Sequence, residues 1–303
     1  MWGPPPVPKP GCVPLRPLGL GDILDGSFTV IRRNPRVMLG LSALVAVAQA
    51  VIVAGFSLFT FASLGNINVT GTGDATTSLG PLVGTESVQL IGLVASTLLG
   101  AILTGMLTIA ITQDVLGVSL SVAQVWARVR GRIWPLLGIA VLTTLLEFLG
   151  LVFCLAPGIW LWGIWSVAVP ALMVENRTIR GALGRSRQLV AGTFWRVWGI
   201  RALGTLIATF IGGFLVVPFE VAGLIVDNNV FSPDAGANHL PVVFLVLTAI
   251  GSALSATFTA PIRAGIDALL YVDLRMRKEG LDIALQHAVV PQPPAAPTAR
   301  TAF

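Results

Sequence analysis

The stretch IRRNPRVMLGLSALVAVAQAVIVAGFSLFTFASLG, residues 31-65, indicates the structural class of the protein, because its basic residues end at Arg36 and an uncharged apolar run follows. A membrane-spanning helix needs about 20 consecutive apolar residues. The run from 37 to 64 is longer than that and therefore predicts a transmembrane helix. Pro35 is expected to separate this span from the helical pattern before it.

The 19 Lys and Arg residues repeat this arrangement along the chain. They form four clusters, Lys9 to Arg36, Arg128 to Arg132, Arg177 to Arg201 and Arg263 to Arg300. Each stretch between clusters has room for two passes, so every cluster returns to the same side, and an excess of Lys and Arg in short loops marks that side as cytoplasmic. We therefore predict six spans with both termini cytoplasmic, at about 37-64, 88-111, 135-154, 157-174, 198-225 and 241-260.

Composition excludes an ordinary soluble domain. Hydrophobic residues make up 54% of the chain and charged residues 11%, whereas about 25% charged is usual for soluble domains. Lipid must therefore cover most of the surface. The pI of 10.2 does not indicate nucleic acid here, because the basic residues border apolar spans, where they meet anionic lipid head groups.

A basic amphipathic segment precedes three of the spans. In residues 21-34 the apolar side chains recur at helical spacing with charged residues opposite, and segments 121-134 and 178-198 repeat the pattern. Each is predicted to be an interfacial helix on the inner leaflet. The chain is therefore predicted to be an all-α integral membrane protein of three hairpin repeats. Residues 17-286 form this membrane domain, and 1-16 and 287-303 are expected to be disordered cytoplasmic tails.

Three segments carry a family resemblance: PLRPLGLGDILDGSFTVIRRNP (14-35), VPALMVENRTIRGALGRSRQLVAGTFWRV (169-197) and APIRAGIDALLYVDLRMRKEGLDIAL (260-285). They resemble integral membrane proteins common in actinobacteria, which are similar to the membrane domain of glycerophosphoryl diester phosphodiesterases. The resemblance covers about residues 15-286 and implies a plasma-membrane protein. It does not imply the phosphodiesterase reaction, because that chemistry belongs to a separate soluble domain with acidic and His metal ligands, which these residues do not contain.

The residues offer no catalytic set. The only histidines are His239, in an expected outer loop, and His287, in an expected cytoplasmic tail. On this topology they cannot share a metal site or serve one nucleophile. We therefore predict no enzyme activity, no metal and no cofactor.

Two acidic residues lie within predicted spans. Glu147 is 12 residues beyond Pro135, so it lies about 18 Å along its helix, just past the bilayer centre. Glu220 follows Pro218 in the outer part of the fifth span. Intramembrane carboxylates are costly and often functional. They are expected either to line one cavity open to the outside, as cation acceptors or proton relays, or to serve structure alone, with Glu147 protonated and Glu220 at the outer interface.

Basic side chains suggest two further roles. Arg263 with Asp267, and Asp273 with Arg277, have i,i+4 spacing and are expected to pair as a structural latch, with a partner-docking surface as the alternative. Arg201 is expected to reach the inner head groups.

Trp160, Trp162 and Trp165 are expected to form an outer aromatic anchor. Lipid head groups or a partner are expected at Arg32, Arg33, Arg128, Arg132, Arg185 and Arg187.

Two function classes remain open. The first is a noncatalytic scaffold or accessory subunit that contacts anionic lipids and a membrane or cytoplasmic protein partner. The second is a small transporter or lipid-handling protein that uses Glu147 and Glu220. The first is favoured, because no pair of spans shows the matched helix interruptions that many carriers have.

Overall fold

The computed structural model describes residues 11–14, 16–65, 79–153, 155–226, 242–281 and 283, and these residues form helices without a strand. Six candidate spans are present, as predicted. Their main helices are α2 (Pro35–Gly65), α3 (Leu79–Val115), α5 (Ile133–Phe153), α6 with α7 (Leu155–Ile164 and Ala168–Val174), α9 (Phe194–Val226) and α10 (Val242–Glu279). The third candidate span extends back from α5 to Val122. The chain is therefore built as a multi-pass membrane protein.

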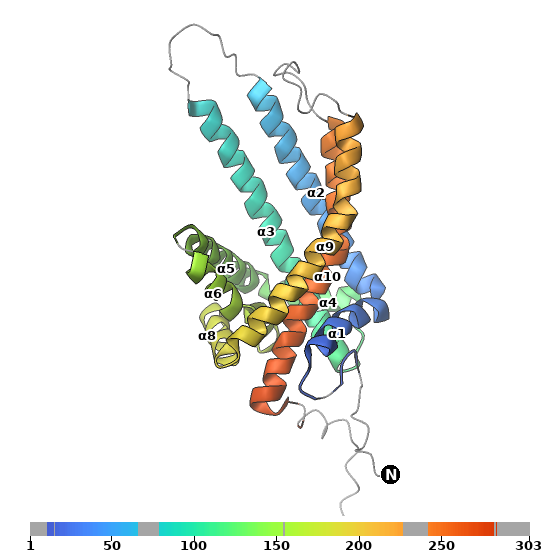
Figure 1. The fold of residues 1–303 in the computed structure, drawn as a ribbon, viewed down its shortest axis with the longest axis vertical. Coiled ribbons are helices and arrows are strands. Elements are labelled where there is room, and N and C mark those ends of the chain that lie inside the picture. Colours follow the sequence, from blue (N-terminus) through green and yellow to red (C-terminus); the bar gives the residue numbers. More distant parts are fainter. Residues whose placement is uncertain are drawn as a thin grey trace, which may run out of the picture.

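Three short helices each come directly before a span. They are α1 (Leu20–Arg33), α4 (Val122–Val129), which runs on into the single turn η1 (Arg130–Arg132), and α8 (Ile179–Val190). The side chains of Ser121 and Thr178 start α4 and α8 by accepting hydrogen bonds from the N–H groups of Gln124 and Gly181. All three short helices lie toward the lower end of the molecule, near the last turns of α10 (Figure 1).

The buried core is concentrated at this lower end. Leu269, Leu270 and Tyr271 in the second half of α10 are at most 1% exposed. Farther along the spans, large apolar side chains face outward, and Phe210 and Phe214 of α9 are 72% and 83% exposed. Such a surface is stable only against lipid.

Small residues allow the spans to approach closely. A Cβ atom on Gly150 of α5 would lie 2.9 Å from the Cα of Gly158 of α6, so the two backbones touch at this crossing. On α9, a Cβ atom on Gly212 would lie 2.7 Å from the hydroxyl of Ser255 on α10. Close backbone approach through small residues is the usual way in which helices associate in lipid.

The fourth span is broken. Helix α6 ends at Ile164 and α7 begins at Ala168. Pro170 supplies the reason, because it lacks the N–H that would bond to the carbonyl of Ser166 and its ring crowds that carbonyl. Broken backbone at membrane depth must find other partners, and here the hydroxyl of Ser186 donates to the carbonyl of Ile164 at 2.6 Å.

The N-terminal segment is packed against the helices, which corrects part of the predicted disordered tail. Cys12 and Val13 are 1% and 0% exposed. Residues 1–10 and the predicted tail 287-303 lie outside the described residues. The tail prediction therefore fails at residues 11–13, where Gly11 packs against the end of α3 and Val13 against Gly26 of α1.

A cluster that we call the Asp273 clamp fastens this segment. The carboxylate of Asp273 accepts hydrogen bonds from Leu18 N at 2.8 Å, Arg196 Nη1 at 2.5 Å and Arg277 Nε at 2.9 Å. Both arginines also donate to the carbonyl of Leu18, each at 2.8 Å. The predicted pair Asp273–Arg277 is thus present, and it holds the N-terminal segment to α9 and α10.

Candidate functional site

Glu147 lies on α5 and lines two adjoining cavities of about 400 and 440 Å³. No hydrogen bond or ion pair reaches its carboxyl group from the part of the chain that the structure describes. The charges that act on it belong to Arg201 and Asp267. An unpartnered carboxyl group in an apolar span is stable only with a proton or with a cation beside it.

The larger of the two cavities beside Glu147, which we call the central cavity, lies among the spans. Its lining comes from α2, α3, α5, α7, α9, α10 and the segment between α6 and α7. It includes Glu147, Arg201, Arg263 and Asp267. Arg201 Nε donates to Asp267 Oδ1 at 3.1 Å, and Arg201 also donates to the carbonyl of Trp162. A half-buried ion pair therefore lies beside the unpartnered Glu147.

This pair corrects two predictions. Asp267 pairs with Arg201 of α9, whereas Arg263 donates to the hydroxyl of Thr209 at 3.2 Å, so the expected Arg263–Asp267 pair is not formed. Arg201 does not reach toward head groups. Its guanidinium carbon lies 4.4 Å from the ring centre of Trp162, over the ring face.

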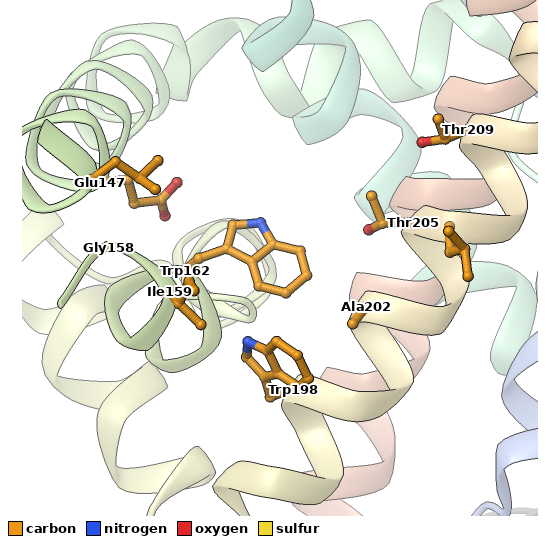
Figure 2. A pocket seen from close by; sticks show the side chains of 10 residues that line it. Glu147, Gly158, Ile159, Trp162, Trp198, Ala202, Thr205 and Thr209 are labelled. Carbon is orange, nitrogen blue, oxygen red and sulfur yellow. The ribbon is translucent and has the colours of Figure 1, made fainter. Parts of the chain in front are cut away.

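The smaller cavity, which we call the Trp chamber, adjoins the central cavity at Glu147. Figure 2 shows the carboxyl group of Glu147 pointing toward the indole of Trp162, with Trp198 below it and the hydroxyls of Thr205 and Thr209 on the opposite wall. Of the three tryptophans expected to form an outer aromatic anchor, Trp162 and Trp165 line cavities and Trp160 is 49% exposed.

The break in the fourth span lies on the central cavity. Trp165, Ser166 and Ala168 line it, and the buried hydroxyl of Ser166 has no hydrogen-bond partner among the described residues. Discontinuous helices with free polar groups form the binding sites of many transporters. One interruption of this kind is found in the described spans, so the matched pair of interruptions that many carriers have is not formed there.

Glu220 does not share these cavities. It lies half-buried near the far end of α9 and lines neither the Trp chamber nor the central cavity. The expected joint cavity of Glu147 and Glu220 is therefore not formed. The charged residues that share a cavity with Glu147 include Arg201 and Asp267, and Glu220 is not among them.

The six predicted head-group contacts divide into two sets. Arg32, Arg128 and Arg187 are exposed. The others have internal partners. Arg33 pairs with Asp114 at 3.5 Å, and Arg132 donates to the carbonyls of Leu172 in α7 and of Asn176 between α7 and α8. Arg185 pairs with Glu175 and Glu279. The first set has exposed side chains without an internal partner in the described structure, while the paired Arg33 still has 40% of its side chain exposed.

Glu175 organises the polar end of the bundle. It accepts hydrogen bonds from Arg185 Nε at 2.9 Å and from the hydroxyl of Tyr271 at 2.9 Å. Burial acts to raise its pKa, but these hydrogen bonds and the positive charges of Arg185 and Arg275 outweigh it and hold the pKa of Glu175 below its ordinary value. The same contacts raise the pKa of Arg185 despite its burial, so this pair stays ionised near neutral pH.

Sequence reasoning missed Arg201, Asp267 and Ser166 as a group. A signal was present for Ser166, since Pro170 follows it by four positions and breaks the helix there. None was present for the pairing of Arg201 with Asp267, which are 66 positions apart. Only tertiary packing brings them together.

No group of three His, Cys, Asp or Glu side chains that could hold a metal occurs among the described residues. Comparison with protein-family models, curated proteins and solved structures found no match.

Proposed function

We propose that this protein is a noncatalytic lipid-handling protein or small transporter that binds its ligand at Glu147, inside the membrane. The observation that carries the proposal is the unpartnered carboxyl group shared by two cavities. A structural carboxyl group would be expected to find a partner on a neighbouring helix. Glu147 instead faces space that a ligand of modest size would fill.

The surroundings of Glu147 support this proposal. The pair Arg201–Asp267 and the broken fourth span add polar groups on the central cavity. Ser166 leaves a hydroxyl without a partner in the described structure. Polar groups inside a membrane domain that are not used for packing mark ligand or ion pathways.

We further propose that the protein lies in a plasma membrane, with the end that carries α1, α4 and α8 in the cytoplasm. The exposed arginines at this end support that orientation through the positive-inside rule. The order of short helix, span and span, repeated three times, supports an origin in three hairpin units. The resemblance to the membrane domain of glycerophosphoryl diester phosphodiesterases supports the choice of membrane.

A scaffold or accessory subunit is the second candidate. Its support is the exposure of Arg32, Arg128 and Arg187, which leaves basic side chains available to anionic lipid or to an acidic partner segment. The two candidates predict different bound molecules.

Native mass spectrometry of the protein, gently extracted from its own membrane, tests the proposal. We expect a retained lipid or small solute in the wild type and its loss in Ala202→Phe, which places a ring in the Trp chamber. Val221→Phe adds the same ring to a lipid-exposed site on the same helix and should keep the ligand. A stoichiometric protein partner without a retained small molecule would support the scaffold instead.

A further inference from the structure

The charge of the Trp chamber is the first indication of what it binds. Glu147 is the only charged residue in its lining. Arg201, whose charge acts on Glu147, is already paired with Asp267. Arg263 lines the adjoining central cavity and donates to the hydroxyl of Thr209 at 3.2 Å. No ion pair joins either arginine to Glu147 in the described structure, so an ionised Glu147 leaves the chamber lining itself with one negative charge. A cationic ligand would supply a counterion, and an anionic ligand would be repelled.

The aromatic walls are the second indication. The rings of Trp162 and Trp198 have centres 6.3 Å apart and planes at 80°, so they form two walls of a corner. Tryptophan faces attract cations whose centre lies within about 6 Å of the ring. Trp162 already holds the guanidinium of Arg201 in this way at 4.4 Å. Trp162 and Trp198 both line the chamber, so the aromatic surface that Arg201 leaves uncovered beside Glu147 is of the kind that binds organic cations.

The ligand set does not suit a metal ion. Calcium takes about six to eight oxygen ligands, and magnesium also needs several oxygens in a regular arrangement. The Trp chamber offers one carboxyl group, with the hydroxyls of Thr205 and Thr209 on the opposite wall (Figure 2). One carboxyl group between indole rings suits a larger cation with an apolar surface.

The remaining walls favour an apolar body on this cation. Ile159 and Leu206 line the chamber and are 42% and 52% exposed, so the chamber borders the lipid-facing surface. The indole N–H of Trp198 is buried and has no hydrogen-bond partner in the described structure. An amphiphile entering from the bilayer could place its tail along these walls and an acceptor oxygen at Trp198.

We propose that the Trp chamber binds an amphiphilic organic cation, with its ammonium group held between Glu147 and the indole rings of Trp162 and Trp198. This inference rests on the proposed function and names the substrate class of the same site. It requires no covalent step, because binding consists of ion pairing, cation–π contact and burial of the tail.

Three probes with the same alkyl chain test the charge preference: dodecyltrimethylammonium, its neutral isostere with carbon in place of nitrogen, and dodecyl phosphate. Each is titrated into the full chain in an uncharged maltoside detergent, and occupancy is read by native mass spectrometry. We expect the wild type to prefer the ammonium probe over the neutral isostere by about tenfold or more. Glu147→Gln should remove this preference. Glu220→Gln, which changes a carboxyl group outside the chamber, should keep it.

Two results would overturn the inference: equal binding of the ammonium and neutral probes by the wild type, or an unchanged preference in Glu147→Gln. Binding of dodecyl phosphate that Ala202→Phe blocks would also overturn it, while leaving the proposed function standing with a ligand of opposite charge. If Ala202→Phe alters the binding of none of the three probes and the wild type retains no ligand from its own membrane, the inference and the proposed function fail together.

Discussion

Removing the carboxylate of Asp273 should release the N-terminal segment without unfolding the bundle. Asp273 is fully buried and binds Leu18, Arg196 and Arg277. Loss of one partner from a buried ion pair costs about 3–5 kcal/mol, because the other charge stays unpaired. The side chains of Arg196 and Arg277 are 31% and 37% exposed and can turn toward water. We therefore expect the lower end of this range for Asp273→Ala, about 3 kcal/mol.

The rate at which Cys12 is labelled measures how readily the N-terminal segment is released. Cys12 is 1% exposed, and its burial together with the negative charge of Asp114 raises the pKa of its thiol to about 12. Maleimide reacts with the thiolate, so labelling requires the segment to open. A loss of about 3 kcal/mol from the opening free energy corresponds to a labelling rate about a hundredfold higher. The measurement uses a Cys154→Ser background, in which Cys12 is the remaining cysteine.

Two further variants serve as a control and as an intermediate case for the labelling rate. Asp25→Ala removes an exposed carboxylate from α1 and should leave the labelling rate unchanged. Asp273→Asn keeps one acceptor oxygen and should give an intermediate rate. A wild-type rate in Asp273→Ala, measured on protein that still unfolds cooperatively on heating, would refute the conclusion that the clamp holds the segment.

Three other predictions follow from the packing and charge of the bundle. Because the pKa of Glu175 is lowered in the folded protein, its contribution to stability is present above the ordinary value of 4.5 and is lost as pH falls through the folded pKa; thermal unfolding of Glu175→Gln should depend less on pH below 4.5 than that of the wild type. Gly150→Ala should lower the free energy of unfolding by about 1–3 kcal/mol, because the new Cβ meets the backbone of Gly158. In the control Gly40→Ala the new Cβ meets no atom within 4 Å, so the free energy of unfolding should not fall. Denaturation in detergent measures both variants. Arg187→Ala should weaken retention of anionic lipid about fivefold, since a basic residue near the head groups is worth about 1 kcal/mol, which lipid counting by native mass spectrometry would measure.

The spans could be predicted because their signals are local. The apolar run after Arg36 predicts the first span, and the basic cluster at Arg128 to Arg132 predicts where the third span begins. Neither prediction needs information from the rest of the chain. The amphipathic helices were equally accessible, since apolar spacing on one face requires only neighbours in sequence. Helices α1, α4 and α8 lie where these patterns predict them.

The site could be predicted only in part. Glu147 stands out in any apolar run, but the cavities beside it depend on how distant spans pack. The i,i+4 rule suggested that Arg263 pairs with Asp267, yet Arg201 of a neighbouring helix takes the carboxylate and Arg263 turns to Thr209. Spacing along one helix identifies pairs that can form, and packing against the next helix decides which of them do.

The Asp273 clamp also has a consequence for biogenesis. Leu18 donates to a carboxylate 255 positions later in the chain and is bound by an arginine 259 positions later. Because these partners are synthesised so long after Leu18, the segment cannot take its final place until α10 has been made and inserted. Contacts of such long range also form slowly. A ribosome-bound chain that stops before Asp273 would expose Cys12 and Val13, the kind of apolar surface that chaperones and proteases recognise in unfinished membrane proteins.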